Sequence, residues 1–213
     1  MRVVLLGPPG AGKGTQAAQL SAYLGVAHVA SGDLLRDHQA RGTPLGQQAS
    51  SYMQRGLLVP DGIVINMILD HLTKPACSQG CLLDGFPRTM DQAFALDQAL
   101  EDDSGIDKVL YINVSPEELL HRLAGRWTCG SCGTPYHEIT APPKVIRQCD
   151  KCEGQLHQRE DDRSSAVARR IEVYQTQTIP LVNYYLEQGK LRQVNGEGTI
   201  EEVEAKLKSL VQQ

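Results

Sequence analysis

The chain has 213 residues, of which 41% are hydrophobic and 22% are charged, and its formal net charge at pH 7 is −4. This length and composition are typical of one sizeable globular core with small insertions. The negative net charge disfavours a protein that binds nucleic acid non-specifically.

The N-terminus leads directly from Met1 through a short apolar stretch into a glycine-rich loop. It lacks the apolar segment and cleavage site of a signal peptide, and no apolar run approaches the ~18 residues that a membrane-spanning helix needs. We therefore expect a cytoplasmic protein with no membrane partner. In that compartment the six cysteines are expected to be thiols or metal ligands rather than disulfides.

Short apolar runs alternate with longer amphipathic ones, which predicts βαβ units and a parallel sheet. The predicted strands are Arg2–Leu6, His28–Ala30, Cys81–Asp84, Lys108–Val114 and Leu191–Asn195. The first predicted helix runs from the glycine loop to about Tyr23, and the others are Ser31–Gly42, Pro44–Gly56, Asp61–Thr73, Met90–Leu100, Pro116–Ala124, Ser164–Gln188 and Ile200–Val211. Ser31 is expected to cap its helix, and Pro44 suits a first helical turn.

A glycine-rich loop, Gly7-Pro-Pro-Gly-Ala-Gly-Lys-Gly-Thr15, follows the first strand and opens the first helix. This is the context of a phosphate-binding P-loop, in which glycines let backbone N–H groups face a polyphosphate and the helix N-terminus adds a favourable dipole. Lys13 is placed to reach the β- and γ-phosphates of a nucleoside triphosphate. The motif by itself predicts a nucleotide and not a particular reaction.

Gly14 follows Lys13 where the general motif has Ser or Thr, and Thr15 comes one residue later. The usual hydroxyl ligand for Mg²⁺ is therefore missing at this position. We expect Mg²⁺ to rest on ATP oxygens, water and another carboxylate. Asp84, at the end of a predicted strand, is the natural candidate.

Four cysteines form two C-x₂-C pairs, Cys129 with Cys132 and Cys149 with Cys152, inside a stretch rich in proline and glycine. Two such pairs at this spacing predict a tetrahedral Zn²⁺ site with four thiolates and no open position, which makes the site structural. A loop-rich insertion with little core of its own would gain its stability from the metal. His137 lies nearby but is not expected to be a ligand.

Beyond the phosphate loop, three segments resemble those of adenylate kinases within the nucleoside monophosphate kinase family. They are Ser31-Gly-Asp-Leu-Leu-Arg36, Leu83-Asp-Gly-Phe-Pro-Arg-Thr89 with Gln92, and Arg159-Glu-Asp-Asp162 followed by Arg170. The match continues to Val194-Asn-Gly196 and covers nearly the whole chain in order. It resembles the long form of the family, which has a zinc-binding lid.

The resemblance implies two nucleotide sites and a set of catalytic residues. The AMP site would use Ser31, Arg36, Leu57, Leu58, Val59, Gly85, Phe86, Pro87, Arg88, Gln92, Arg159 and Arg170. The ATP site would use Gly10, Ala11, Gly12, Lys13, Gly14, Thr15, Arg122, Arg126, Pro135, Tyr136 and the backbone near Gly198. The catalytic set would be Lys13, Asp84, Arg88, Arg126, Arg159 and Arg170. Trp127 departs from the family, which often has a second arginine there, and its indole is expected to pack on the adenine or the lid hinge.

The resemblance also implies the fold, the domains and the reaction. The fold would be an α/β P-loop nucleoside triphosphate hydrolase type, with a five-stranded parallel sheet flanked by helices and two mobile insertions. Residues 1–29, 60–125 and 163–213 would form the core, 30–59 the AMP-binding domain and 126–162 the zinc lid. The reaction would be ATP + AMP = 2 ADP, with Mg²⁺ accompanying ATP, catalysed by a monomer that maintains adenine nucleotide levels.

The chemistry of this reaction suits the residues present. A phosphate oxygen of the acceptor is already anionic, so no general base is needed, and catalysis rests on positioning and on cations near the transferred group. The sequence also bears on two alternative functions. A nucleic-acid-dependent ATPase is disfavoured because residues 123–163 have six Lys or Arg against six Asp or Glu. A sibling kinase that acts on UMP, CMP or GMP, or that uses GTP as donor, stays open, because base choice depends on few contacts.

Overall fold

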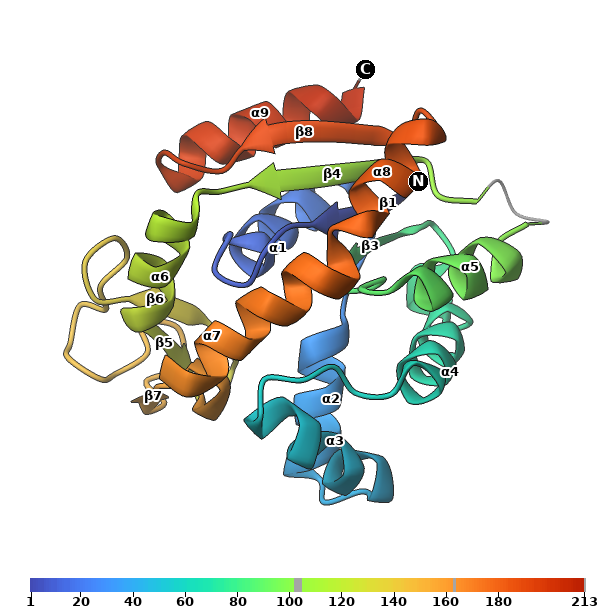
Figure 1. Ribbon diagram of the computed structural model, residues 1–213. Coiled ribbons are helices and arrows are strands. Elements are labelled where there is room, and N and C mark those ends of the chain that lie inside the picture. Colours follow the sequence, from blue (N-terminus) through green and yellow to red (C-terminus); the bar gives the residue numbers. More distant parts are fainter. Residues whose placement is uncertain (102–104, 163, 213) are drawn as a thin grey trace.

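The computed structural model describes residues 1–101, 105–162 and 164–212. Residues 163 and 213, which bound the third predicted segment of the core, lie outside these ranges. Figure 1 shows a sheet sandwiched between helices, with a helical arm and a small second sheet extending from it. Among the helices within these ranges, none has both the length and the apolar character that crossing a membrane requires.

The central sheet has five strands, all parallel, in the order β2-β3-β1-β4-β8. The strands are β1 (Arg2–Leu6), β2 (Ala27–Ala30), β3 (Cys81–Asp84), β4 (Lys108–Asn113) and β8 (Leu191–Asn195). All five predicted strands are therefore confirmed, with ends that differ by at most one residue. The predicted class, a five-stranded parallel α/β fold, is confirmed as well.

Helices connect these strands and build the arm. They are α1 (Lys13–Leu24), α2 (Ser31–Ala40), α3 (Pro44–Gln54), α4 (Asp61–Leu72), α5 (Met90–Ala99), α6 (Pro116–Ala124), α7 (Ser164–Val173), α8 (Pro180–Glu187) and α9 (Ile200–Gln212). Short 3₁₀ helices lie at Pro75–Cys77 and Glu160–Asp162. The helix predicted as Ser164–Gln188 is not uniform, because a π-helical turn at Tyr174–Thr178 separates α7 from α8.

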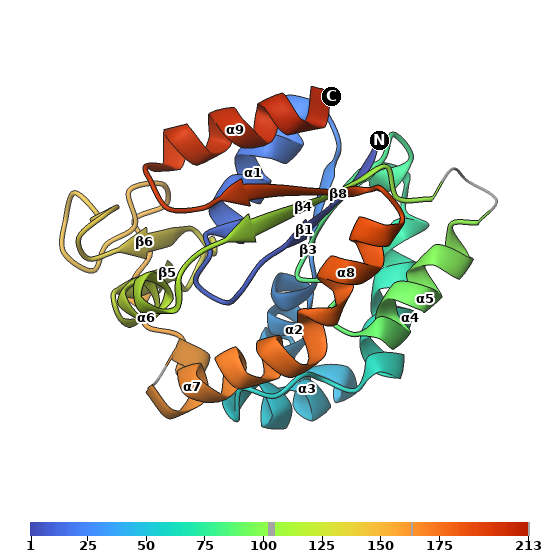
Figure 2. The same cartoon turned by 45° about the horizontal axis from the view of Figure 1, so that its top comes forward.

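Alternate residues of β1 point to opposite faces of the sheet, and both faces are buried. Val3 and Leu5 join one apolar cluster with side chains of α1 and α9, whereas Val4 and Leu6 join another with side chains of α4, α5 and α8. Figure 2 shows α1 and α9 together on one side of the sheet. Burial on both faces explains why β1, β3 and β4 are nearly continuous apolar runs. Burying one large apolar side chain contributes about 1.5–3 kcal/mol to folding.

The helices α2 and α3 form an arm that extends away from the sheet in both views (Figures 1 and 2). Thr43 caps α3 by accepting a hydrogen bond from the Gly46 backbone N–H at 3.1 Å, and Pro44 occupies the first turn as predicted. The predicted capping role of Ser31 is wrong. Ser31 is itself the first residue of α2, and its hydroxyl instead donates to the Gly85 carbonyl oxygen at 2.6 Å.

The cysteine-rich segment contains a second, antiparallel sheet that the sequence did not predict, with the strand order β6-β5-β7. Its strands are β5 (Arg126–Cys129), β6 (Pro135–His137) and β7 (Leu156–His157). Among the residues that the structure describes, the buried apolar cluster of this segment has four members: Cys129, Tyr136, Cys149 and Leu156. The prediction of a small core is confirmed, and two of its four residues are cysteines of the C-x₂-C pairs.

Candidate active site

A cleft of about 910 Å³ lies where the glycine loop, the arm and the second sheet face one another. Its volume is near the upper end of the range for small-molecule sites. The cleft brings together nearly every residue that the sequence assigned to a nucleotide: Gly10, Ala11, Gly12, Lys13, Gly14, Thr15, Ser31, Arg36, Leu57, Leu58, Val59, Asp84, Gly85, Pro87, Arg88, Gln92, Arg122, Arg126, Pro135, Tyr136, Arg159, Arg170 and Gly198. Phe86 differs, because its side chain is fully buried in the core.

The glycine loop wraps around the ammonium group of Lys13. The Nζ atom donates to the carbonyl oxygens of Gly7 at 2.7 Å and Pro8 at 3.0 Å. Gly10 and Gly12 have φ angles of 88° and 86°, a left-handed conformation that favours glycine. Burial lowers the pKa of Lys13 to about 8, against the opposing attraction of Asp84. An anion in the cleft would restore the charged form of this lysine.

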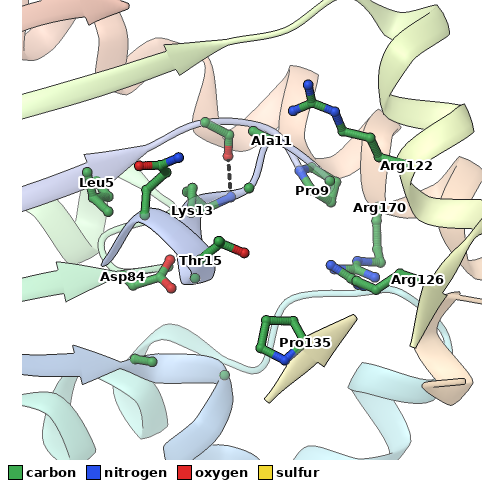
Figure 3. Close-up of a pocket in the computed structure, with 18 of the residues that line it drawn as sticks. Leu5, Pro9, Ala11, Lys13, Thr15, Asp84, Arg122, Arg126, Pro135 and Arg170 are labelled. Carbon is green, nitrogen blue, oxygen red and sulfur yellow. Dashed lines mark hydrogen bonds between the residues drawn. The ribbon is translucent and has the colours of Figure 1, made fainter. Parts of the chain in front are cut away.

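Asp84 ends β3 on the floor of the cleft, close to Lys13 and Thr15 (Figure 3). Burial opposes ionisation of its carboxyl group, but the neighbouring His28 and Lys13 outweigh it and hold the pKa of Asp84 below its usual value. His28 Nε2 lies 3.7 Å from Asp84 Oδ2. A partly buried, ionised carboxylate beside a phosphate loop is the kind of oxygen donor that Mg²⁺ prefers, so the residues present fit the ion.

Arginines converge on the same cleft from separate parts of the chain. Arg88 lies in the β3–α5 loop, Arg126 begins β5, Arg159 follows β7 and Arg170 lies on α7. Figure 3 shows Arg122, Arg126 and Arg170 opposite Lys13 and Asp84.

The pKa values of these arginines reflect their crowding. Burial and the charge of Arg170 lower the pKa of Arg88 to about 10. Burial and the charges of Arg36 and Arg126 lower the pKa of Arg159 to about 10. The guanidinium groups stay protonated near neutral pH, so the cleft is a strongly electropositive site suited to polyanions.

Two aspartates form ion pairs with these arginines. The sequence had assigned neither aspartate a role. The side chain of Asp162 is fully buried and accepts from Arg126 Nε at 2.7 Å and from Arg170 Nη1 at 2.8 Å. Asp161 Oδ2 lies 3.0 Å from Arg170 Nη1. Because a guanidinium–carboxylate pair has fixed, forked geometry, these carboxylates hold the arginines in defined orientations.

In the segment after β3, two side chains donate hydrogen bonds to one backbone carbonyl group. Arg88 Nε donates to the Gly85 carbonyl oxygen at 2.7 Å, which also accepts from Ser31 Oγ. A Cβ atom added at Gly85, whose φ is 74°, would come within 2.8 Å of Arg88 Nη2 and 3.0 Å of Ser31 Oγ. Glycine is therefore required both for the backbone conformation and for the close approach of these two side chains.

The four cysteines of the C-x₂-C pairs place their Sγ atoms within 4.8 Å of one another. Cys129 and Cys152 have Sγ atoms 3.4 Å apart, and those of Cys132 and Cys149 are 3.6 Å apart. Sulfur atoms around tetrahedral zinc lie about 3.8 Å apart, given Zn–S bonds of about 2.3 Å. The arrangement fits Zn²⁺. His137 faces elsewhere, with Nδ1 accepting backbone N–H groups of two residues that follow it.

Tyr136 and Trp127 link this cluster to its surroundings. The Tyr136 hydroxyl is 3.4 Å from Cys149 Sγ and accepts from the Asp150 backbone N–H at 2.7 Å, while the residue also lines the cleft. Trp127 packs against the cysteine-containing cluster, and its Nε1 donates to Glu138 Oε1 at 2.8 Å. The side chain of Trp127 therefore packs on the cysteine-containing segment, of which it is a part.

Comparison with known proteins settles the family. The family model described as adenylate kinase matches residues 5–190. The chain belongs to the adenylate kinase family. The adenylate kinase of Syntrophobacter fumaroxidans is 47% identical over 99% of this chain and 100% of its own length. That of Methanocella arvoryzae is 49% identical over 99% of this chain and 98% of its own. That of Caldicellulosiruptor bescii is 51% identical over 90% of this chain and 89% of its own length.

Residues absent from the predicted site also contact its members in this adenylate kinase cleft. Among them are His28 beside Asp84, Asp161 and Asp162 beside arginines, Asp61 beside Gln92 and Thr178 beside Arg88. The Asp-Asp pair at 161–162 was a visible signal, because acidic residues next to a predicted phosphate-binding arginine need an explanation. For Thr178, which contacts a residue 90 positions away, the sequence alone contained no such signal.

Proposed function

We propose that the cleft binds ATP and AMP together and transfers the γ-phosphoryl group of ATP reversibly, in the reaction ATP + AMP = 2 ADP. The observation that carries this proposal is the convergence of Lys13 and four arginines, from five separate segments, on one cleft beside a phosphate loop. Membership of the adenylate kinase family agrees with it. In each turnover a P–O bond forms to an AMP phosphate oxygen while the bond between the γ-phosphorus and the ATP β–γ bridging oxygen breaks.

The donor would lie against the glycine loop. There, backbone N–H groups and the positive end of α1 would bind the β- and γ-phosphates, with Lys13 closing over them. Arg122 and Arg126 would contact the same nucleotide, and Pro135, Tyr136 and the backbone near Gly198 would line its remaining surface. Asp84 would hold Mg²⁺, which when bound neutralises phosphate charge.

The acceptor would lie between the arm and the β3–α5 loop. Arg36 and Arg88 would bind the AMP phosphate, and Gln92 would meet the base. Ser31, Gly85, Pro87 and the segment Leu57, Leu58, Val59 would shape the pocket. Phe86, assigned to this site from the sequence, would act by packing beneath it, in keeping with its full burial.

The transferred phosphoryl group would pass between Lys13, Arg88, Arg126, Arg159 and Arg170. These cations would stabilise the charge that spreads over its oxygens in the transition state. AMP offers an anionic phosphate oxygen, so a general base is unnecessary. Water must be kept out, because it competes with AMP for the phosphoryl group.

We propose that residues 126–162, the lid, and residues 30–59, the AMP-binding domain, close over the bound nucleotides to exclude this water. The core would be residues 1–29, 60–125 and 163–213. Cys129, Cys132, Cys149 and Cys152 would bind a structural Zn²⁺ that keeps the lid folded. Thiolate ligands suit a reducing compartment such as the cytoplasm. The proposed reaction needs residues of one chain only, so we propose a monomer.

The test is to incubate the purified protein with MgATP and, separately, AMP, UMP, CMP or GMP, and to quantify the nucleotides by chromatography. We expect rapid turnover with AMP and two ADP formed for each ATP consumed. Faster turnover with another monophosphate would contradict the assignment of the base. Absence of turnover with every acceptor, in protein that contains zinc, would contradict the kinase reaction itself.

A further inference from the structure

A closed set of hydrogen bonds surrounds the side chain of Gln92. Its Oε1 atom accepts the backbone N–H of Arg88 at 2.8 Å, and its Nε2 atom donates to Asp61 Oδ1 at 2.7 Å. The other carboxylate oxygen of Asp61 accepts from Thr89 Oγ1 at 2.8 Å, and this hydroxyl accepts from the Gln92 backbone N–H at 3.2 Å. Gln92 is only 2% exposed, yet it lines the cleft.

This network fixes which end of the Gln92 amide is oxygen and which is nitrogen. The backbone N–H of Arg88 can only donate, and the carboxylate of Asp61 can only accept. A flipped amide would set N–H against N–H at Arg88 and oxygen against oxygen at Asp61. The Arg88 N–H and the Asp61 carboxylate would then each lose a hydrogen bond. Because Gln92 is buried, leaving these polar groups unpaired would be especially unfavourable.

The fixed amide leaves a defined pattern for a ligand. An amide oxygen has two lone pairs and an amide nitrogen has two hydrogens, so one acceptor and one donor remain after the contacts with Arg88 and Asp61. Adenine presents the complementary pair, an exocyclic amino donor beside a ring nitrogen acceptor. A 6-oxo purine presents the reverse, a carbonyl acceptor beside a ring N–H donor. A free glutamine could read either base by flipping, but this one cannot.

We propose that Asp61 is a positioning residue that holds the Gln92 amide in the orientation that selects 6-amino over 6-oxo purine monophosphates as phosphoryl acceptors. This inference rests on the proposed function, in which Gln92 meets the base of the acceptor. Asp61 is the first residue of α4, on the opposite side of Gln92 from the Arg88 backbone contact. Selectivity would thus depend on a residue that contacts the base only through Gln92.

The test compares AMP with IMP, two acceptors that differ only at the edge in question. For the unsubstituted protein we expect kcat/KM to favour AMP by about 10³-fold or more, because a site built to hydrogen-bond one pattern rejects its reverse. In Asp61→Asn, residue 61 can present either an amide oxygen or an amide nitrogen to Gln92. The AMP-to-IMP ratio should then fall about tenfold, while the Arg88 N–H still opposes a full flip.

Two controls separate orientation from general loosening. CMP repeats the amino and ring-nitrogen pattern of adenine, so the AMP-to-CMP ratio of Asp61→Asn should stay within about twofold of the unsubstituted value. Asp70→Asn, an exposed substitution near the other end of the same helix, should leave both ratios unchanged. If Asp61→Asn does not fold, Asp61→Ser provides the same comparison, because a hydroxyl group can also donate or accept.

Equal loss of activity with AMP and IMP in Asp61→Asn, with the ratio unchanged, would overturn the orientation role and leave the proposed function intact. A parallel fall in the AMP-to-CMP ratio would also overturn it, because the pocket would then have lost shape rather than polarity. Absence of AMP-dependent turnover in the unsubstituted protein is a different result. It would overturn the proposed function and with it this inference.

Discussion

The hydroxyl of Thr178 donates a hydrogen bond to the backbone carbonyl of Arg88 at 2.9 Å, joining two residues that are 90 positions apart. Thr178 is buried and is the last residue of the π-helical turn that separates α7 from α8. Arg170, on α7, lies two turns earlier in the same helical stretch. One helix therefore contributes one cleft arginine directly and anchors the backbone of another. Such π-helical turns are frequent at functional sites.

Thr178→Val should lower kcat/KM for AMP without unfolding the protein. Valine has the shape of threonine but leaves the Arg88 carbonyl without this donor, a change of about 1–2 kcal/mol, which corresponds to a roughly tenfold fall in kcat/KM for AMP. Thr178→Ser keeps the hydroxyl and should stay within about twofold of the unsubstituted enzyme.

Thr176→Val is the matched control, because the hydroxyl of Thr176 bonds only to carbonyls of its own helix, those of Glu172 and Val173, among the described contacts. Steady-state kinetics with AMP varied at saturating MgATP measure the effect. Equal losses in the serine and valine variants would show that the hydrogen bond is not what matters at this position.

Arg88→Lys should lower the rate of the chemical step by about 10²–10³, by analogy with the loss of one preorganised donor at a transition state. Lysine keeps the charge but not the forked geometry that lets a guanidinium contact Gly85 and a phosphate together. Single-turnover measurement of ADP formation reports this step directly. A rate close to that of the unsubstituted protein would mean that charge alone suffices at position 88.

The fold was predictable because its signals are local. The strand Arg2–Leu6 is apolar at every position but its first, and the helix Pro116–Ala124 begins with proline, so both were predicted with the ends that the structure has. The cysteine cluster was predictable for a similar reason, since C-x₂-C pairs bring their ligands together through short-range geometry. These features need no knowledge of distant contacts.

The parts that were missed depend on contacts distant in sequence or on elements too short to have a periodic pattern. Ser31 looked like a helix cap, but a hydrogen bond to Gly85, 54 positions away, determines its role. The small antiparallel sheet around Trp127 has strands of two to four residues, too short to show a periodic pattern. Asp61 and Thr178 likewise look like ordinary helix residues until the fold brings them beside Gln92 and Arg88.

The buried ammonium group of Lys13 predicts a pH effect on the binding of ATP. Its pKa is about 8 in the free protein, so above that pH the neutral form predominates and no longer attracts phosphate. We expect kcat/KM for ATP to fall by up to about tenfold per pH unit above 8, whereas kcat, which reports the nucleotide-bound enzyme, should persist to higher pH because bound phosphates raise this pKa.

The lysine can also be observed directly. NMR titration of isotope-labelled lysine side chains, with Lys13→Met used to assign the signal, should give a midpoint near pH 8 without nucleotide and a higher one with a bound ATP analogue. A midpoint for Lys13 that matches those of exposed lysines, or that nucleotide leaves unchanged, would rule out this explanation of the pH profile.

Loss of the metal should have two effects at once. The lid should unfold, and KM for ATP should rise. The cluster of Cys129, Tyr136, Cys149 and Leu156 is too small to hold the segment by apolar burial alone, so its stability depends on the zinc that the cysteines are proposed to bind. Cys149→Ser should abolish stoichiometric zinc and lower the midpoint of thermal unfolding by about 10 °C, the shift expected for about 3–4 kcal/mol in a protein of this size.

The same variant should raise KM for ATP more than KM for AMP. The Tyr136 hydroxyl contacts Cys149 Sγ while the residue lines the cleft, so disorder around the metal reaches the proposed ATP site first. Cys77→Ala removes a thiol outside the cluster and should keep one zinc per chain, as measured by elemental analysis. If Cys149→Ser retained both the zinc and the unfolding midpoint, the four cysteines would not be the metal site. If it lost zinc but kept its KM for ATP, the metal would stabilise a segment that ATP does not need.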